Sequence, residues 1–513
     1  MGIVMGTDYL IVGSGLSALV FGALMAKAGK QVLILEAHEY PGGFGHTFSM
    51  GKYHRFNAQL HYVWNCGEGQ TVNRILRKLE LEKDVTFEPF DRNGFDHMRM
   101  PGYALDIPAD SQQLSDRLCQ LFPGHMKQIA GFLREVERTA SGLGVLSSHQ
   151  PFKEVFGHVG DTLSSLRNLN CTLQDVFDRH GLPLEAQTLL ALQWPDFMLP
   201  PDQLAFYSWV LLFTGYQEGA WYPTKHFEHV VDSLVTTIKS ADGEIMYGQQ
   251  VDKFVLAGNR VVGVEACDLQ TGESIRYEGS HTICNMDPQK AAGIIGLEKF
   301  SSGIRKRLDY PYSYSNFIAY CTVKDIDLEE YGFGRWNIFH ASSSDLNAAI
   351  NKMYVHHDYS EPSFAISTPG FLTDDISDRP QGQQIVELLT IADYDYFKQL
   401  KETDGKAYKR KKKEILNAML DQIEANYVPD FRAHIAFKIT GSPTTNEDYC
   451  WCPRGNSYGS SMTPAYFGLG RLTHQSSLEN FHFCNASSGY PGFAGTFWTG
   501  AKLYQTLTDD KVF

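Results

Sequence analysis

The stretch that decides the fold lies near the N-terminus and has three parts: Tyr9-Leu-Ile-Val-Gly-Ser-Gly-Leu-Ser-Ala18, Val32-Leu-Ile-Leu-Glu36 and Gly42-Gly43. Tyr9 to Val12 is a short apolar run of the kind that is buried in a parallel sheet. Apolar residues recur at helical spacing from Leu16 to Leu24, and Gly29 follows as a helix stop. The pattern predicts a strand, a glycine turn, a helix and a second strand that ends in an acid.

The glycines and the acid of this stretch suit a dinucleotide. Gly13 permits the tight turn out of the strand, and Gly15 has no Cβ, so a pyrophosphate can approach the backbone. Ala18 is a permitted third residue of the fingerprint and lets the helix pack close to the strand. The pyrophosphate would rest on the helix N-terminus, while the Glu36 carboxylate accepts hydrogen bonds from ribose hydroxyls. Because that carboxylate repels a 2′-phosphate, the site disfavours NADP.

A second strand–turn–helix unit lies at the opposite end of the chain. Phe481–Cys484 has the pattern of a strand, Asn485–Gly495 is rich in small residues, and Thr496–Leu503 has helical spacing. We expect this unit to make a second contact with the same cofactor. A long cofactor that is touched from both ends of the chain fits FAD better than NAD.

The composition is that of a globular protein of two or more domains or one large composite. Hydrophobic residues make up 43% and charged residues 20% of the chain, and the net charge is −14. Without a long basic run, a nucleic-acid partner is disfavoured. We expect a cytoplasmic location, because the first apolar run is the predicted strand itself and not a signal peptide.

The longest apolar run, Leu204–Phe213, is too short to span a membrane. We interpret it as a buried helix, with a segment that dips into a membrane as the alternative. The nine cysteines are scattered, and only Cys450 and Cys452 lie close together, one residue apart. That spacing fits neither a metal site nor a redox motif, so we expect no metal and reduced thiols packed as small hydrophobes, with a catalytic thiol pair as the alternative.

The rest of the chain alternates helical and strand patterns. Residues 112–140 and 161–216 have helical spacing, and Phe48–Tyr62 predicts strands around a turn at Gly51. The central block comprises a helix at Val230–Ile238, a strand at Gly243–Val251, a hairpin from Asp252–Leu256 to Arg260–Cys267 that turns at Gly258-Asn259, and a strand at Ser274–Ile283. Lys401–Ala425 predicts one charged helix, and we interpret its basic run Lys409–Lys413 as a solvated face and not a binding patch.

These motifs together resemble one known family. The glycine turns, His46-Thr47-Phe48 and Phe56-Asn-Ala-Gln-Leu-His61-Tyr62 are similar to the FAD-dependent carotenoid desaturase, carotenoid isomerase and retinol saturase superfamily, related to phytoene dehydrogenases, and most similar to its retinol saturase branch. Further similar blocks are spread over most of the chain: Trp221-Tyr-Pro223, Cys284-Asn-Met-Asp-Pro288 and Pro453-Arg-Gly-Asn-Ser-Tyr-Gly459.

The resemblance implies an α/β fold in which a Rossmann-type FAD-binding domain is interleaved with an α+β substrate-binding domain of mixed sheet and helices. The FAD-binding domain would comprise residues 1–108, 217–297 and 440–513, and the substrate-binding domain residues 109–216 and 298–439. It further implies noncovalent FAD, held by the first glycine turn at its pyrophosphate and by Glu36 at its ribose. The residues expected to contact FAD are Gly13, Gly15, Ala18, Glu36, Ala37, Gly42, Gly43, Val251, Asn485, Gly492 and Phe493.

The chain departs from the family at two places. The family ends its last strand with Gly-Asp, whose acid holds ribityl or phosphate oxygens, whereas Asn485 and Ala486 stand there in this chain. FAD would therefore be held differently or more loosely at this end. The family's Gly-Gly after Tyr-Pro is replaced by Thr224 and Lys225. Lys225 either approaches the pyrophosphate or is a surface residue.

The resemblance implies an enzyme: an FAD-dependent desaturase, saturase or isomerase that acts on C–C or C=C bonds of a lipophilic, polyene- or isoprenoid-like substrate, with peripheral membrane contact. His61 and Tyr62 are the candidates for proton transfer near the flavin. His61 could equally be structural, and His46 favours a structural role. Arg454, with Tyr458, either anchors a polar end of the substrate or forms a structural salt bridge.

Two further alternatives stay open. Phe493, Phe497 and Trp498 either wall a tunnel or belong to the core. The rival to the enzyme is a flavin-less escort protein that binds prenyl groups, resembling Rab GDP-dissociation inhibitors. Loss of the acid at Ala486 favours the rival slightly, and the intact N-terminal glycines favour the enzyme more.

Overall fold

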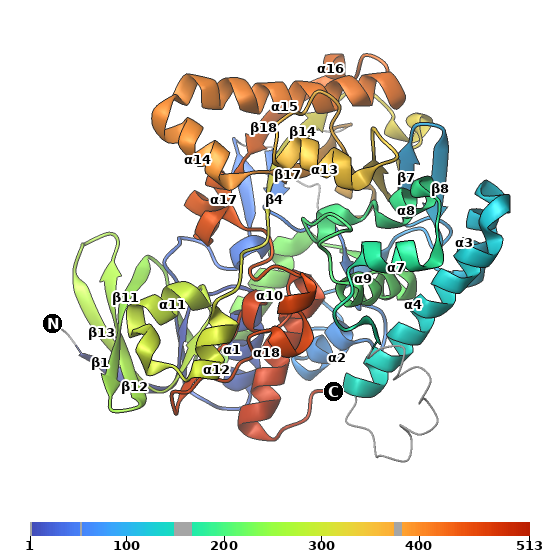
Figure 1. The fold of residues 1–513 in the computed structure, drawn as a ribbon. Coiled ribbons are helices and arrows are strands. Elements are labelled where there is room, and N and C mark those ends of the chain that lie inside the picture. The colour runs from blue at the N-terminus through green and yellow to red at the C-terminus, as the bar shows by residue number, and fades with distance from the viewer. Residues whose placement is uncertain (1–2, 52–53, 148–166, 374–381) are drawn as a thin grey trace.

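The computed structural model describes residues 3–51, 54–147, 167–373 and 382–513. Two large sheets organise it, and helices pack against both of them (Figure 1). The first sheet carries both ends of the chain, and the second is built mainly from its later middle part. Two small sheets link them: β3 (Thr47–Met50) with β4 (His54–Asn57), and β9 (Ala220–Pro223) between β5 (Val63–Trp64) and β6 (Phe87–Pro89).

The first sheet has a parallel centre. β1 (Ile3–Val12) pairs with β2 (Val32–Leu35) on one side and with β13 (Ser274–Cys284) on the other. β19 (Phe481–Phe483) pairs with β13, and β10 (Glu244–Met246) pairs with β2, both in parallel. The carboxyl ends of strands from distant parts of the chain therefore meet at one edge, where open α/β sheets bind ligands.

A hairpin extends this sheet on one side. β11 (Gln249–Ala257) and β12 (Arg260–Asp268) pair antiparallel, and Ala257 faces Arg260 across the turn. This confirms the hairpin predicted around Gly258-Asn259. The predicted single strand Gly243–Val251 is wrong, because Gly248 adopts a positive φ of 69° and separates β10 from β11.

Helix α1 (Leu16–Lys27) follows β1 and is buried on every side, because its residues from Leu16 to Ala26 are all apolar or small. It packs against α10 (His226–Ser240) and α18 (Gly492–Thr508). A Cβ at Gly500 would lie 2.4 Å from the Ser17 carbonyl oxygen, so α18 approaches α1 at a distance that only glycine allows. α18 begins earlier than the predicted Thr496, which brings its N-terminus to the cofactor edge of the sheet.

The second sheet is mixed, and its strands in spatial order are β18 (Ile435–Gly441), β14 (Ser315–Val323), β17 (Gln384–Ala392), β16 (Phe364–Ser367), β15 (Asn337–His340), β7 (Asp96–Met100) and β8 (Tyr103–Ile107). Every residue of β14 is buried. The predicted domain boundary at residue 108 assigns β7 and β8 to the first domain, but β7 pairs in parallel with β15 of the second sheet. The division into two domains otherwise stays a prediction.

Helices cover the second sheet from two directions (Figure 1). α13 (Leu346–Tyr354), α14 (Tyr394–Thr403) and α15 (Gly405–Asn426) lie over β14 and β17. The helices that gather near β7 and β8 are α3 (Ser111–Leu121), α4 (Met126–Ser147), α7 (Leu173–His180), α8 (Leu184–Ala191) and α9 (Phe206–Glu218). The remaining helices are α2 (Thr71–Lys78), α11 (Pro288–Ile295), α12 (Ser302–Leu308), α16 (Phe431–His434) and α17 (Pro443–Cys450).

The charged helix predicted at Lys401–Ala425 is two helices, because the Asp404 side chain accepts hydrogen bonds from the backbone N–H groups that start α15. The interpretation of its basic run as a solvated face is wrong for Lys411 and Lys412, which are half-buried. The Lys411 ammonium lies 5.3 Å from the centroid of the Tyr359 ring, and Lys412 donates to the Thr440 carbonyl. These lysines hold α15 to its neighbours.

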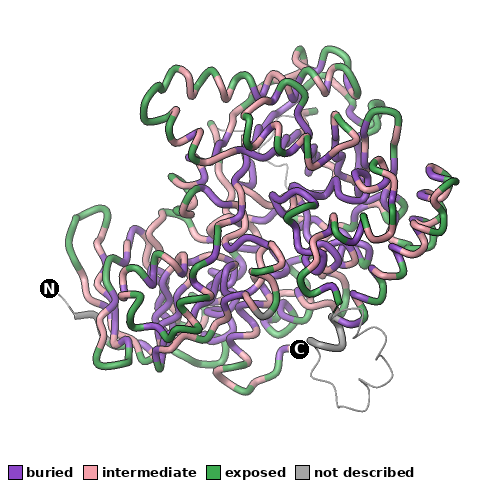
Figure 2. Tube along the Cα trace, viewed as in Figure 1, coloured by how far each residue is buried: buried purple, intermediate pink, exposed green. Residues whose placement is uncertain are grey.

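Burial follows the two sheets and the helices between them (Figure 2). Helix α9 contains the predicted Leu204–Phe213 segment in large part, and that segment is mostly buried, as expected. Within the described residues, each helix is either too short or too polar to cross a membrane. All nine cysteines are free thiols, which confirms that part of the expectation.

Candidate cofactor site and the polar groups beside it

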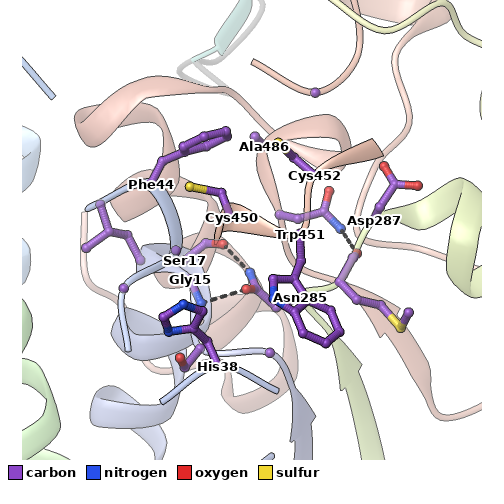
Figure 3. Close-up of a pocket in the computed structure, with 18 of the residues that line it drawn as sticks. Gly15, Ser17, His38, Phe44, Asn285, Asp287, Cys450, Trp451, Cys452 and Ala486 are labelled. Carbon is purple, nitrogen blue, oxygen red and sulfur yellow. Dashed lines mark hydrogen bonds between the residues drawn. The ribbon is translucent and has the colours of Figure 1, made fainter. Parts of the chain in front are cut away.

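A cavity of about 310 Å³ opens at the carboxyl ends of β1, β2 and β13. Its lining comes from the first glycine turn, the second glycine turn, the start of β11, the loop after β13, residues 449–453 and 456–459, and the turn before α18 (Figure 3). Strand ends, glycine turns and a helix N-terminus therefore converge on one space, as a dinucleotide site requires.

Asn285 ties the first glycine turn to the far end of the chain. Its side-chain oxygen accepts from the Gly15 backbone N–H at 2.8 Å, and its amide donates to the Ser17 hydroxyl at 2.9 Å (Figure 3). The amide also donates to the Cys484 carbonyl at 2.5 Å. A Cβ at Gly15 would lie 2.7 Å from that Asn285 oxygen. Gly15 is therefore required by an internal contact, in addition to the approach of a pyrophosphate.

Because Asn285 occupies the Gly15 N–H, the donors for an anion are the N–H groups of the first turn of α1. The N–H groups of a helix's first turn have no partner within the helix. Leu16 and Ser17 both line the cavity at this turn. The helix dipole adds positive partial charge at the same place.

The Glu36 carboxylate lies directly after β2 and is fixed by backbone and hydroxyl donors. One oxygen accepts from the Ser14 N–H at 2.7 Å and from the Ser14 hydroxyl at 2.5 Å. The other oxygen accepts from the His38 N–H at 2.8 Å. The carboxylate therefore has a defined position at the cavity edge, where the oxygen that accepts from His38 has a second lone pair left for a ribose hydroxyl.

The second glycine turn packs against the first. The Gly42 N–H donates to the Ser14 carbonyl at 2.9 Å, and Gly42 and Gly43 have φ of 105° and 56°. The His46 ring nitrogen Nδ1 lies 2.6 Å from the Gly43 carbonyl, which fits the structural role considered for His46. Burial lowers the pKa of His46, so the ring is neutral and holds the turn by donating one hydrogen bond.

The turn before α18 is held without an acid. Asn485 accepts at its side-chain oxygen from the N–H groups of Ser487 and Ser488, each at 3.0 Å. Arg471, which is 5% exposed, donates to the Ala486 carbonyl at 2.6 Å and to the Gly489 carbonyl. Burial lowers the pKa of Arg471 to about 10, and the guanidinium stays charged. Where the similar family has a carboxylate, this chain has Ala486, and the buried Arg471 guanidinium donates to the backbone carbonyls of this turn.

Among the lining residues that the sequence did not predict as cofactor contacts are Asp287, Lys290 and Trp451. Asp287 caps α11 and accepts from the Tyr312 hydroxyl at 2.7 Å, and burial raises the pKa of its carboxyl. Lys290 lies with its ammonium 5.7 Å from the centroid of the Trp451 ring, and Trp451 has a φ of 57°. The Asn-Met-Asp-Pro block carried the only sequence signal for Asp287. Nothing in the sequence pattern joined Lys290 to Trp451.

The structure separates the predicted cofactor contacts into two groups. Most of them line the cavity: Gly13, Gly15, Glu36, Ala37, Gly42, Gly43, Val251, Asn485 and Gly492. Ala18 is fully buried in α1, and Phe493 is 3% exposed and packs on the rings of Phe87, Phe227 and Phe497. Ala18 and Phe493 are not among the described lining residues, and the core alternative fits Phe493 and Phe497.

The candidate substrate anchors also differ in their placement. Arg454 forms an ion pair with Asp395 at 2.6 Å, with its side chain 49% exposed, and lies outside the described lining of the cavity. Lys225 pairs with Asp84 at 2.7 Å on the surface. Tyr458 lines the cavity and donates to the Pro195 carbonyl at 3.1 Å. Cys450 also lines the cavity, and burial raises the pKa of its thiol to about 12, so it is protonated.

His61 lies one residue beyond Leu60, which lines the cavity. Its Nδ1 is 2.8 Å from the carboxylate of Glu387, a residue of β17 that is 4% exposed. The other ring nitrogen, Nε2, is buried and has no hydrogen-bond partner among the described residues. The partner of His61 is thus a carboxylate from the second sheet and not the backbone carbonyl of the structural alternative, and one ring nitrogen is left open.

The Tyr62 hydroxyl contacts Asp96 and Asp196, and not the Glu387 carboxylate that His61 contacts. Its ring stacks on Tyr216 with centroids 4.0 Å apart and planes 3° from parallel. Its hydroxyl donates to Asp196 at 2.7 Å and also lies 3.2 Å from an oxygen of Asp96. His61 and Tyr62, neighbours in sequence, therefore contact different carboxylates.

Comparison with known proteins agrees with this geometry. Residues 11–79 match the family model of an NAD(P)-binding Rossmann-like domain. The chain is 23% identical over 528 residues to an all-trans-retinol 13,14-reductase of Danio rerio, covering 96% of this chain and 84% of the relative. It is 21% identical over 536 residues to a chloroplastic prolycopene isomerase of Arabidopsis thaliana, covering 94% of this chain and 79% of the relative.

The fold is similar to that of a solved putrescine oxidase, with a TM-score of 0.67 at 12% identity, over 99% of this chain and 100% of the other. Fold and relatives together define the class: this chain is an oxidoreductase with a Rossmann-like domain and mixed sheets. Within that class it is similar along nearly its whole length to the carotenoid desaturase, carotenoid isomerase and retinol saturase superfamily. The resemblance noted in the sequence is thereby confirmed.

Proposed function

We propose that the chain binds FAD noncovalently in the cavity and acts on C–C or C=C bonds of a lipophilic polyene. The observation that carries the proposal is the convergence of both glycine turns, the fixed Glu36 carboxylate and the start of α18 on one cavity. The full-length similarity to a retinol reductase and a prolycopene isomerase supports the polyene class of substrate.

The residues present fit FAD. At Gly43 a Cβ would meet only the Cα of Gly15, at 3.4 Å, so a cradle without side chains lies between the two turns. Glu36 would hold the adenosine ribose, and the N–H groups of Leu16 and Ser17 would hold the pyrophosphate. Lys290 would add a cation beside the pyrophosphate. When bound, FAD supplies the hydride chemistry, and the protein supplies position, shielding from water and proton transfer.

We propose that the His61 ring accepts and donates a proton during this reaction. The Glu387 carboxylate holds Nδ1, which fixes the ring orientation and favours a proton on that nitrogen. Nε2 is then free to accept a proton or, in the imidazolium, to donate one. A carboxylate that orients a histidine in this way is a recurring arrangement in general acid–base catalysis.

The first test is the absorption spectrum of the purified protein. We expect the two visible bands of an oxidised flavin, released on denaturation because the attachment is noncovalent. A colourless protein that cannot be loaded with FAD would refute the flavin and favour the prenyl-binding escort protein. The relatives favour the enzyme over that escort function.

The second test identifies the reaction. The FAD-loaded protein is incubated anaerobically with all-trans-retinol or with prolycopene, with and without a chemical reductant, and the products are separated by chromatography. Saturation needs the reductant and adds hydrogen, desaturation needs an oxidant, and isomerisation changes no oxidation state. Peripheral membrane contact and the cytoplasmic location stay predictions, to be tested by sedimentation with phospholipid vesicles and by cell fractionation.

A further inference from the structure

Two carboxyl groups, one buried and one half-buried, share one tyrosine hydroxyl near the cavity. Asp96 lies on β7 and is fully buried, and Asp196 ends the short turn Trp194–Asp196. The Tyr62 oxygen lies 2.7 Å from an oxygen of Asp196 and 3.2 Å from an oxygen of Asp96. We call Asp96 and Asp196 the acid pair.

The hydrogen count favours a carboxyl proton in this group. The Tyr62 hydroxyl has a single hydrogen and can donate one linear hydrogen bond, to one carboxylate. If Tyr62 donates to Asp196 at the shorter distance, a hydrogen bond to Asp96 requires that the Asp96 carboxyl donates to the phenol oxygen. At least one member of the acid pair is therefore protonated whenever both contacts are hydrogen bonds.

The surroundings of the acid pair agree with that count. The titratable groups that face it are Tyr62, Tyr216 and Tyr458, and its other hydrogen-bond partners are the amides of Gln193 and Asn337. Within the described chain, these contacts include no lysine, arginine or histidine. Burial raises the pKa of Asp96 to about 7 and also raises the pKa of Asp196 well above its ordinary value.

The acid pair lies close to two residues that line the cavity. Leu60, two residues before Tyr62, and Tyr458 both line the cavity, and the Tyr458 hydroxyl donates to the residue before Asp196. Asp196 keeps some accessible surface, whereas Asp96 has none. The fully buried Gln193 holds Asp96 with its amide nitrogen, while its oxygen has no partner among the described residues. One polar position in this group is thus left open.

We propose that Asp96, Tyr62 and Asp196 form the proton store of the reaction proposed above, on which this inference rests. Saturation of one C=C bond adds a hydride and a proton. Both carboxyls of the acid pair carry a proton at the start. Asp196 gives its proton to the substrate carbon on its accessible side, and Tyr62 then passes its own hydrogen to Asp196 while it takes one from Asp96. Asp196 and Tyr62 end as they began, and Asp96 ends as a carboxylate. In desaturation the same steps run in reverse, and the store takes up the proton that the substrate loses.

The store is tested first without any turnover. Infrared spectra of the FAD-loaded protein are recorded in light and heavy water from about pH 5 to about pH 9. We expect the C=O band of a buried carboxylic acid near neutral pH, lost or shifted in Asp196→Asn and in Tyr62→Phe. Tyr359→Phe is the matched control, because its buried hydroxyl donates to the Ile391 carbonyl and contacts neither member of the acid pair. Absence of the band in the wild type would overturn the store, whether or not any variant folds.

The second arm measures proton delivery with all-trans-retinol and the chemically reduced, FAD-loaded protein. We expect Asp196→Asn to lower kcat at least about tenfold with little change in KM, to shift the pH profile, and Asp196→Glu to recover part of the rate. A rate and a pH profile unchanged in Asp196→Asn would overturn delivery. A wild type inactive on this probe counts against the proposed function alone, since the infrared bands still decide the store.

Discussion

The two sides of the cofactor cavity differ in how their polar groups are satisfied. On the side of the first glycine turn, Glu36 accepts three hydrogen bonds and Asn285 makes three more. On the side of Tyr62, a ring nitrogen of His61 and an oxygen of Gln193 are buried without partners among the described residues. The first side is fixed before any ligand arrives, as tight binding requires. The second side keeps the carboxyl groups of Asp96 and Asp196, whose protonation can change.

The largest expected effect breaks the fixed side. Glu36→Arg replaces the ribose acceptor by a cation and should weaken FAD binding by about a hundredfold or more, which corresponds to about 3 kcal/mol. The ratio of flavin to protein after gel filtration and a fluorescence titration measure it. Glu39→Arg, at an exposed position nearby, is the control for the charge change. Full loading of Glu36→Arg would show that the cradle has been placed wrongly.

The next effect concerns the side of Tyr62 and appears as a dependence of stability on pH. Burial raises the pKa of Asp96 to about 7, so its contribution to the free energy of unfolding is complete below the unfolded pKa and is lost as the pH rises through about 7. We expect this loss to be smaller by about 2 to 4 kcal/mol in Asp96→Asn.

Urea unfolding from about pH 4 to about pH 8 measures that difference. Asp252→Asn, at an exposed position, should leave the dependence as it is in the wild type. If Asp96→Asn and the wild type lose stability in parallel, Asp96 is ionised throughout and the contrast between the two sides fails.

Asn285→Ala tests whether the fixed side is fixed by the protein alone. The substitution removes the contacts to Gly15, Ser17 and Cys484, and we expect a loss of about 1.5 to 3 kcal/mol in the free energy of unfolding of the FAD-free protein. Asn259→Ala, which removes one exposed hydrogen bond in the hairpin turn, is the control. Equal effects of the two substitutions would mean that Asn285 is not a structural tie.

The smallest effect is expected where the chain departs from the family that it resembles. Ala486→Asp restores the acid beside Arg471, whose guanidinium already donates to the carbonyl of this residue. We expect the FAD dissociation constant to change by less than about tenfold, because the buried guanidinium compensates the new charge. A change larger than that of Glu36→Arg would reverse the comparison and place the main anchor of FAD at the C-terminal turn.

The sequence was most informative where local rules act. Gly13, Gly15 and Glu36 lie where the fingerprint predicts, because strand, turn and helix follow one another directly. Long-range contacts were not accessible from it. The pairing of His61 with Glu387 and of Lys290 with Trp451 depends on which distant segments the fold brings together.

The ends of helices and strands were also predicted poorly, since a single glycine or aspartate decides where an element ends. Gly248 interrupts the predicted strand at Gly243–Val251, and Asp404 divides the predicted helix Lys401–Ala425. In both places the apolar pattern continues across the break, so periodicity alone gives no sign of it. Arg471 shows the same limit for charge: burial of its guanidinium against carbonyl oxygens follows from tertiary packing and has no local pattern.

The hydrogen bonds of Asn285 have a consequence for how the site forms during synthesis of the chain. It joins Gly15, near the start of the chain, to Cys484, near its end, and β1 has its parallel partner β13 only after more than half of the chain has been made. The glycine turn of Gly15 therefore leaves the ribosome long before Cys484, and the binding site exists only once both have been made. A chain cut before Cys484 should appear colourless, and the yellow of bound flavin would report that synthesis had passed this residue.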